Sequence, residues 1–106
     1  MNIKNLIPPE ECASLTEIRD QMDAIDRETI AMLAQRVSYV RAAAKFKTSA
    51  TAVAAPDRVQ AVLNTRREWA EHAGLDGATI EALYRDIVAY CISEEKKHWD
   101  ATQNVT

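Results

Sequence analysis

Four cationic residues and one carboxylate are candidates for a functional site: Arg19, Arg36, Lys47, Arg58 and Glu95. Arg36 interrupts a series of apolar residues spaced by threes and fours, and arginine is almost never fully buried without a partner. Arg58 falls in the expected first turn of a helix, where the helix dipole disfavours a cation, so a nearby anion would explain it. Residues of these types at these positions point to a site for an anionic ligand.

Three of the cations also have an ordinary structural interpretation. The aliphatic stem of Arg36 could cover apolar surface while its guanidinium reaches water. Lys47 follows 11 positions later on nearly the same helical face, and it could be a solvated lysine at a helix end, where cations are favoured. Arg19 could pair with Asp23 across one helical turn. The residues alone leave both interpretations open.

Glu95 shares a helical stripe with apolar residues. Val88, Ile92, Glu95 and Trp99 follow one another at spacings of four, three and four positions. A carboxylate on such a stripe is expected either to stay protonated or to have a cationic partner. The alternative is that the charged run at residues 94–97 frays into solvent. Trp99 itself is interpreted as a core residue.

Several classes of function are disfavoured. The chain has no Ser/His/Asp set, no Gly-rich phosphate loop and no cluster of metal ligands, so we expect neither a hydrolase triad nor a metal or other cofactor. A net charge of -3 argues against a nucleic-acid partner. No apolar run approaches the roughly 20 residues that span a bilayer, and the start of the chain has no signal-peptide core. We therefore expect a cytoplasmic protein with no membrane partner, in which Cys12 and Cys91 are reduced.

These residues must be positioned by helices. A length of 106 residues corresponds to one domain, and two glycines and three prolines are too few to punctuate strands and hairpins. We predict an all-α fold made of an N-terminal arm at 1–13, a very long helix at 14–47, a loop beside the site at 48–55, and further helices at 56–73 and 76–103. The pattern Ser-Leu-Thr-Glu at 14–17 is a capping box. The small and β-branched residues of 48–55 favour a mobile loop.

The length of the first helix predicts a second subunit. At 1.5 Å per residue it is about 50 Å long, whereas a compact monomer of this size is roughly 33 Å across. Its apolar seam continues along the whole helix and comprises Ile18, Met22, Ile25, Met32, Tyr39, Ala43 and Phe46. Because the chain cannot cover this seam itself, we predict an intertwined homodimer with interlocked long helices.

The candidate residues belong to an ordered series that extends over about residues 10–100. The series comprises Glu11, Cys12, Ile18, Arg19, Ile25, Asp26, Arg36, Tyr39, Val40, Ala42, Ala43, Phe46, Lys47, Ala55, Pro56, Arg58, Val59, Trp69, Ala70, Glu71, Gly74, Leu75 and Asp76. In this series the sequence resembles the all-helical chorismate mutase family. Within that family it is most similar to the isochorismate pyruvate-lyases of salicylate biosynthesis.

The resemblance implies a homodimer of three-helix protomers with two equivalent sites for a small dicarboxylate and no cofactor. Arg36, Lys47 and Arg58 would come from one chain and Arg19 from the other, and Glu95 would also belong to the site. Arg19 and Arg36 would grip the two carboxylates by forked hydrogen bonds, and Lys47 would place its ammonium on the ether oxygen of the breaking bond. Arg19 and Arg36 are 17 positions apart, about 26 Å on a straight helix, so they could grip one small molecule only across a dimer.

Two positions bear on which reaction the site performs. Mutases of the family carry a glutamate directly after the equivalent of Arg58, whereas this chain has Val59, as the lyases do. The lyases have glutamine at the equivalent of Glu95, whereas some fungal mutases use a proton-bearing glutamate there. We interpret the chain as a lyase that converts isochorismate to salicylate and pyruvate, and a chorismate mutase that makes prephenate is the alternative. A third hypothesis is a noncatalytic helical dimerisation module whose arginines are surface charges.

Overall fold

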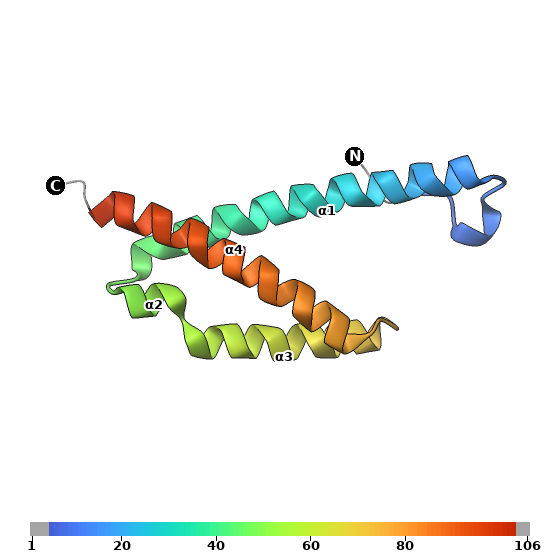
Figure 1. The fold of residues 1–106 in the computed structure, drawn as a ribbon. Helices are drawn as coiled ribbons and strands as arrows, with labels where there is room; N and C mark the ends of the chain where they lie inside the picture. Colours follow the sequence, from blue (N-terminus) through green and yellow to red (C-terminus); the bar gives the residue numbers. More distant parts are fainter. Residues whose placement is uncertain (1–4, 104–106) are drawn as a thin grey trace. The chain divides into compact units, whose positions relative to one another are not determined.

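The structure is a computed structural model that describes residues 5–103. Its elements in chain order are the 3-10 helix η2 (Pro9–Glu11), the helix α1 (Leu15–Ala43), the 3-10 helix η3 (Ala44–Phe46), and the helices α2 (Ala50–Ala54), α3 (Pro56–His72) and α4 (Gly77–Gln103) (Figure 1). Residues 5–103 contain no strand, which confirms the prediction of an all-α fold with a very long first helix. Within this range no helix is both long and apolar enough to cross a membrane. The chain divides into two compact units, Met1–Arg36 and Val37–Thr106, with the boundary inside α1.

The first unit contains the N-terminal arm and α1 up to Arg36. Ser14 Oγ accepts the backbone N–H of Glu17 at 3.1 Å, which is the first half of the predicted capping box. Glu17 Oε2 accepts the N–H of Ala13 at 3.1 Å, one residue before the Ser14 N–H that a capping box uses. The side-chain oxygen of Gln21 accepts the N–H of Ile7 at 2.9 Å, so the arm folds back onto α1. None of residues 5–36 is buried. This part of the chain therefore has no core of its own.

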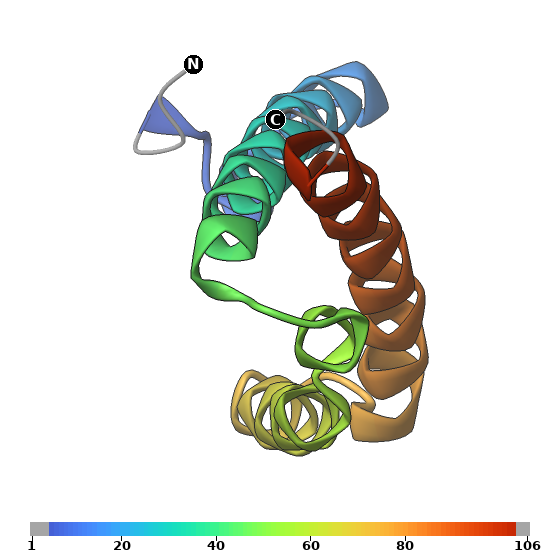
Figure 2. The same ribbon diagram turned by 90° about the vertical axis from the view of Figure 1, so that its left-hand side faces the viewer.

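The second unit has a hydrophobic core. Within it α3 packs along α4, and α2 and η3 also contact α4 (Figure 2). Its buried apolar residues are Val37, Ala44, Val53, Val62, Leu63, Ala70, Val88 and Cys91. Every helical element of the unit contributes at least one of them, because each presents an apolar stripe to its neighbours. This core is the scaffold on which Lys47, Arg58 and Glu95 are mounted.

The turn between α3 and α4 follows standard capping rules. Gly74 has a φ of 81°, the left-handed conformation that glycine adopts most readily. The N–H of Leu75 donates to the carbonyl of Ala70 at 2.8 Å and closes the end of α3. Asp76 caps α4 by accepting the Thr79 hydroxyl at 2.6 Å and the Thr79 N–H at 2.9 Å. The hydrogen bond from the Thr79 hydroxyl lowers the pKa of Asp76 most, and the one from the Thr79 N–H lowers it further.

The first long helix ends earlier than its predicted boundary at residue 47. The α-helical hydrogen bonding stops at Ala43, and the chain continues as η3 to Phe46. Lys47 then takes an extended backbone conformation, with φ −110° and ψ 136°. Neither glycine nor proline marks this ending. The departure from the helix therefore depends on contacts that local sequence does not encode.

Residues 48–55 are also more regular than the loop predicted there, because they contain the short helix α2. Ser49 Oγ accepts the N–H of Ala52 at 3.1 Å and caps this helix. Val53, which is 2% exposed, anchors it in the core. Ala55 ends it with a left-handed φ of 41° before Pro56 begins α3. A capping serine and one buried valine thus outweigh the weak helix propensity of the segment. Its mobility stays a prediction.

Candidate active site

A buried carboxylate and an ammonium group meet inside the second unit. Glu95 is on α4 and is 4% exposed. Lys47 stands at the end of η3, and its Nζ lies 2.6 Å from Glu95 Oε2. Of the two states expected for Glu95, the structure shows the one with a cationic partner. The alternative that residues 94–97 fray into solvent is wrong, because α4 continues to Gln103 and buries Glu95.

The surroundings of this ion pair determine what it can do chemically. The side chains of Lys47 and Glu95 are 24% and 5% exposed, so the pair is largely shielded from water while part of the Lys47 side chain remains exposed. Electrostatic interactions are stronger where water is excluded, so a shielded ammonium can stabilise developing negative charge on a ligand. A ligand that accepts a hydrogen bond from Lys47 has to share the ammonium with Glu95. The pair therefore offers one electropositive group with a fixed direction.

Trp99 holds the backbone of the same lysine. Its Nε1–H donates to the carbonyl oxygen of Lys47 at 2.9 Å. Sequence reasoning assigned Trp99 to the core and missed this hydrogen bond. The spacing of four positions between Glu95 and Trp99 is the signal that could have suggested it, because residues four apart lie on one face of a helix.

The three arginine candidates have different surroundings. Arg58 is exposed in the first turn of α3, as predicted, next to Asp57. Arg19 is exposed and Arg36 is half-buried, and both are on α1 in the first unit. Arg19 forms no ion pair with Asp23, although the structure describes both residues, so that ordinary interpretation does not hold. Of the five candidates, the structure brings Lys47 and Glu95 into contact.

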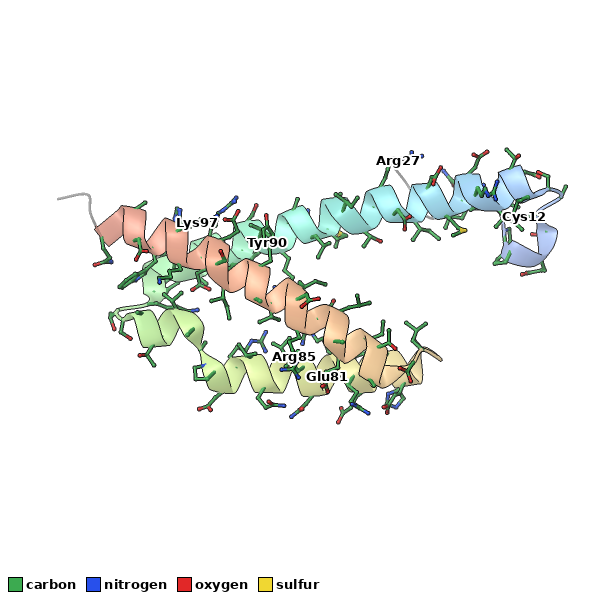
Figure 3. All side chains as sticks on the ribbon, in the orientation of Figure 1. Cys12, Arg27, Glu81, Arg85, Tyr90 and Lys97 are labelled. Atoms are coloured by element: carbon green, nitrogen blue, oxygen red, sulfur yellow. The ribbon has the colours of Figure 1, made fainter. Side chains whose placement is uncertain are left out.

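Glu94 has a different role from its neighbour Glu95. Its Oε1 accepts a hydrogen bond from Arg41 Nη2 at 3.0 Å, and its Oε2 lies 3.3 Å from Lys97 Nζ. Tyr90 also donates to it, at 3.4 Å (Figure 3 shows Tyr90 and Lys97 on α4). The hydrogen bond from Lys97, followed by that from Arg41, holds the pKa of Glu94 below its usual value. These interactions connect the last turn of α1 to α4. Glu94 therefore pairs with Arg41 and Lys97, whereas Glu95 pairs with Lys47.

The remaining reactive side chains do not form a site. Within residues 5–103 no three His, Cys, Asp or Glu side chains come together in a way that could hold a metal ion. Cys12 and Cys91, both within the described residues, form no disulfide. Burial, followed by the carboxylates of Glu17 and Glu10, raises the pKa of the Cys12 thiol, which makes it a poor nucleophile.

Comparison with known families assigns the chain to a class. Residues 18–96, which are 79 of the chain's 106 residues, match the family model described as Chorismate mutase type II. The chain belongs to this family, and the resemblance in its sequence is thereby confirmed.

Individual relatives narrow the assignment. The chain is 42% identical over 95 residues to the isochorismate pyruvate lyase of Pseudomonas aeruginosa, a match that covers 90% of this chain and 94% of that protein. It is 32% identical over 92 residues to the T-protein of Haemophilus influenzae, covering 86% of this chain and 24% of that protein. The T-protein of Enterobacter agglomerans is 30% identical over 84 residues, covering 78% of this chain and 22% of that protein. The chain therefore matches the whole lyase but at most about a quarter of either T-protein.

Proposed function

We propose that the protein is a pericyclic lyase that converts isochorismate to salicylate and pyruvate. The observation that carries the proposal is the 42% identity to an isochorismate pyruvate lyase over 94% of that protein's length. Val59 supports it, since the mutases that the chain resembles carry a glutamate at this position and the lyases do not.

The proposed reaction needs little covalent chemistry from the protein. The ether C–O bond of isochorismate breaks while a ring hydrogen passes to the methylene carbon of the enolpyruvyl group. Pyruvate leaves and the ring becomes aromatic, so every atom of the substrate is kept in the two products. No water, nucleophile or cofactor is consumed. The protein has to confine the dianion in a reactive conformer and stabilise the charge that develops on the ether oxygen.

Lys47 is the residue best suited to that oxygen. Its ammonium is partly shielded from water and is directed by Glu95 at 2.6 Å. Arg19, Arg36 and Arg58 are proposed to bind the substrate carboxylates, because a guanidinium fork matches a carboxylate and Arg58 stands at a helix N-terminus, where an anion is favoured. In this scheme Lys47 and Glu95 act at the reacting bond and the arginines position the substrate.

We also propose a homodimer in which each site takes Arg19 from the partner subunit. Two features support it. Arg19 and Arg36 are separated by 17 positions on one continuous helix, about 26 Å. Several seam residues of α1 are also exposed, among them Met22 at 56% and Met32 at 54%. An apolar helix face of this length is commonly covered by a second copy of the chain.

The proposed location is the cytoplasm. Cys12 and Cys91 form no disulfide, which fits a reducing compartment.

A second candidate function, a chorismate mutase that makes prephenate, is favoured by Glu95 itself. A glutamate at this position is the feature that the chain shares with some mutases and not with the lyases, and it contacts Lys47 directly. Purified protein should therefore be incubated with chorismate and with isochorismate separately, and prephenate, salicylate and pyruvate measured. Salicylate and pyruvate in equal amounts from isochorismate are expected. Prephenate alone would replace the lyase by the mutase, and no product from either substrate would favour a noncatalytic module.

The variant Glu95→Gln sharpens this test. Glutamine keeps a carbonyl oxygen that can accept a hydrogen bond from Lys47 but removes a negative charge that faces a dianionic substrate. We expect the ratio of lyase to mutase kcat/KM to rise in this variant. Glu94→Gln is the matched control, because Glu94 pairs with Arg41 and Lys97 instead.

A further inference from the structure

Lys47 is held by α4 at two points. The Nε1–H of Trp99 donates to the Lys47 carbonyl at 2.9 Å, across 52 positions of sequence. Glu95 Oε2 lies 2.6 Å from the ammonium at the other end of the same residue. Glu95 and Trp99 are four positions apart on α4, so one face of this helix makes both contacts.

The backbone contact is needed because of where the helical geometry ends. Lys47 has an extended conformation, φ −110° and ψ 136°, so a following helical turn does not supply an N–H to its carbonyl. The N–H of Lys47 still donates to the carbonyl of Ala44 at 3.1 Å and keeps the residue attached to η3. The indole therefore fixes the point at which the chain leaves η3 and turns towards α2.

The position of the Lys47 backbone matters because a lysine side chain is flexible. Four methylene groups separate the ammonium from the backbone, and an unrestrained lysine samples many rotamers. Glu95 restrains only the tip of the side chain. A movement of the Lys47 backbone would have to be absorbed by the stem or would shift the ammonium away from its working position.

We propose that Trp99 is a positioning residue of the active site, which acts on catalysis through its hydrogen bond to the Lys47 carbonyl. The expected effect of Trp99 on turnover rests on the proposed function. Its expected effect on the position of the Lys47 backbone does not. Trp99 does not touch the substrate. It sets the position of the Lys47 backbone, so that the ammonium reaches the breaking bond without reorganisation.

The test uses Trp99→Phe, which keeps an aromatic ring in the half-buried site and removes the donor. Misplacing a catalytic group by a fraction of an ångström lowers turnover more than binding, so we expect kcat to fall about tenfold and KM to change less than about twofold. Trp69→Phe is the matched control. Trp69 is 60% exposed and stacks on the Arg66 guanidinium at 4.4 Å, away from the Lys47 contacts.

A second measurement needs no substrate. The chain has two tryptophans, so Trp69→Phe leaves Trp99 as the only source of an indole N–H signal in a nitrogen-15 NMR spectrum. This proton should exchange slowly with solvent in the free protein. Backbone amides of residues 49–55 should exchange several-fold faster in Trp99→Phe than in the parent or in Trp69→Phe.

The outcomes separate this proposal from the proposed function. A slow indole proton, faster amide exchange and a kcat-specific loss in Trp99→Phe support it. An unchanged kcat in an active, folded Trp99→Phe protein overturns it, even if amide exchange is faster. If the parent turns over neither substrate, the proposed function fails and amide exchange alone decides the role of Trp99. If Trp99→Phe does not fold, a rapidly exchanging indole proton in Trp69→Phe still overturns the proposal.

Discussion

The two units of the chain deal with their apolar residues in opposite ways. In the second unit Leu63 is 1% exposed and Val53 is 2% exposed, and α3 and α4 cover each other. In residues 5–36 nothing is buried. The large apolar side chains that α1 exposes there are Leu15, Ile18, Met22, Ile25, Ile30 and Met32, at 41% to 67%.

This difference shows which parts of the site the chain can build alone. The second unit fixes Lys47 and Glu95 by its own packing, because a core and two helices surround them. Arg19 is an exposed residue of a helix segment with no buried residue, so the packing of its own segment does not fix its surroundings. The comparison to be tested is between the proposed catalytic pair, which is held within the second unit, and the proposed binding residues of the first unit, for which a partner subunit is proposed.

The largest effect should come from the second unit, through Lys47→Ala. Removing a group that stabilises developing charge in a water-shielded site lowers kcat by about 100- to 1000-fold, with a smaller change in KM. Steady-state kinetics on the substrate that the parent turns over would measure this. Lys97→Ala is the control, because the Lys97 side chain is 75% exposed and pairs with Glu94 at the surface.

Loss of Lys47 also leaves the carboxylate of Glu95 buried without its cation, so folding must be checked by circular dichroism. The double variant Lys47→Ala with Glu95→Gln removes that charge. A folded double variant that keeps more than a tenth of the parental kcat would show that the pair is structural.

The next effect concerns the first unit, through Met32→Asp. If a second copy covers this seam, each subunit would bury a carboxylate, and the dimer dissociation constant should rise at least about 100-fold. Sedimentation would measure the association. Arg27→Gln makes the same change in net charge five positions away, about 140° around the helix from Met32. Arg27 is an exposed residue of α1 (Figure 3). A parent that sediments as a monomer, or an equal effect of both variants, would contradict the dimer.

Mixing of inactive subunits links the two halves of the comparison. Arg19→Ala and Arg36→Ala proteins should each be inactive alone. In a heterodimer one site recovers both arginines, so after equal mixing and exchange about a quarter of the parental activity should return. Heterodimers that form, as native mass spectrometry would show, but stay inactive would rule out sites shared between subunits.

The same comparison explains how much the sequence could predict. The helical class, the N-cap at Ser14 and the first-turn position of Arg58 depend on neighbours within a few residues. The capping of α2 by Ser49 was not predicted, nor was its weight against the poor helix propensity of residues 48–55. That balance depends on Val53 finding a place in the core.

Contacts between distant residues were the part that could not be predicted. The ion pair of Lys47 with Glu95 was one of two expectations for that carboxylate, and periodicity could not choose between them. The hydrogen bond from Trp99 to Lys47 was missed, because a tryptophan on an apolar stripe has the same pattern whether or not its N–H has a partner. Both contacts join η3 to α4 across about half of the chain.

The smallest expected effect tests whether the second unit depends on its local caps or on its core. Asp76 caps α4, and hydrogen bonds from Thr79 lower its pKa from the usual 3.8. Because the pKa of Asp76 is lower in the folded protein, the unfolded chain binds the proton more tightly. Ionised Asp76 therefore stabilises the fold fully above pH 3.8, and this contribution is lost as pH falls through the pKa of the folded state. Asp76→Ala should therefore melt a few degrees below the parent at pH 7. The difference in melting temperature should shrink as pH falls below 3.8.

Melting curves from pH 7 downwards would check this at a fixed protein concentration, since the melting temperature of a dimer depends on concentration. Asp100→Ala is the control, because Asp100 is an exposed aspartate of α4 outside the capping turn. If the melting temperature falls slightly and in a pH-dependent way in Asp76→Ala but not in Asp100→Ala, the packing of α3 against α4 supplies most of the stability of the second unit. The cap then only adds to it. A loss of cooperative melting would instead mean that the unit depends on its turn, and the contrast with the coreless first unit would be weaker than the buried residues indicate.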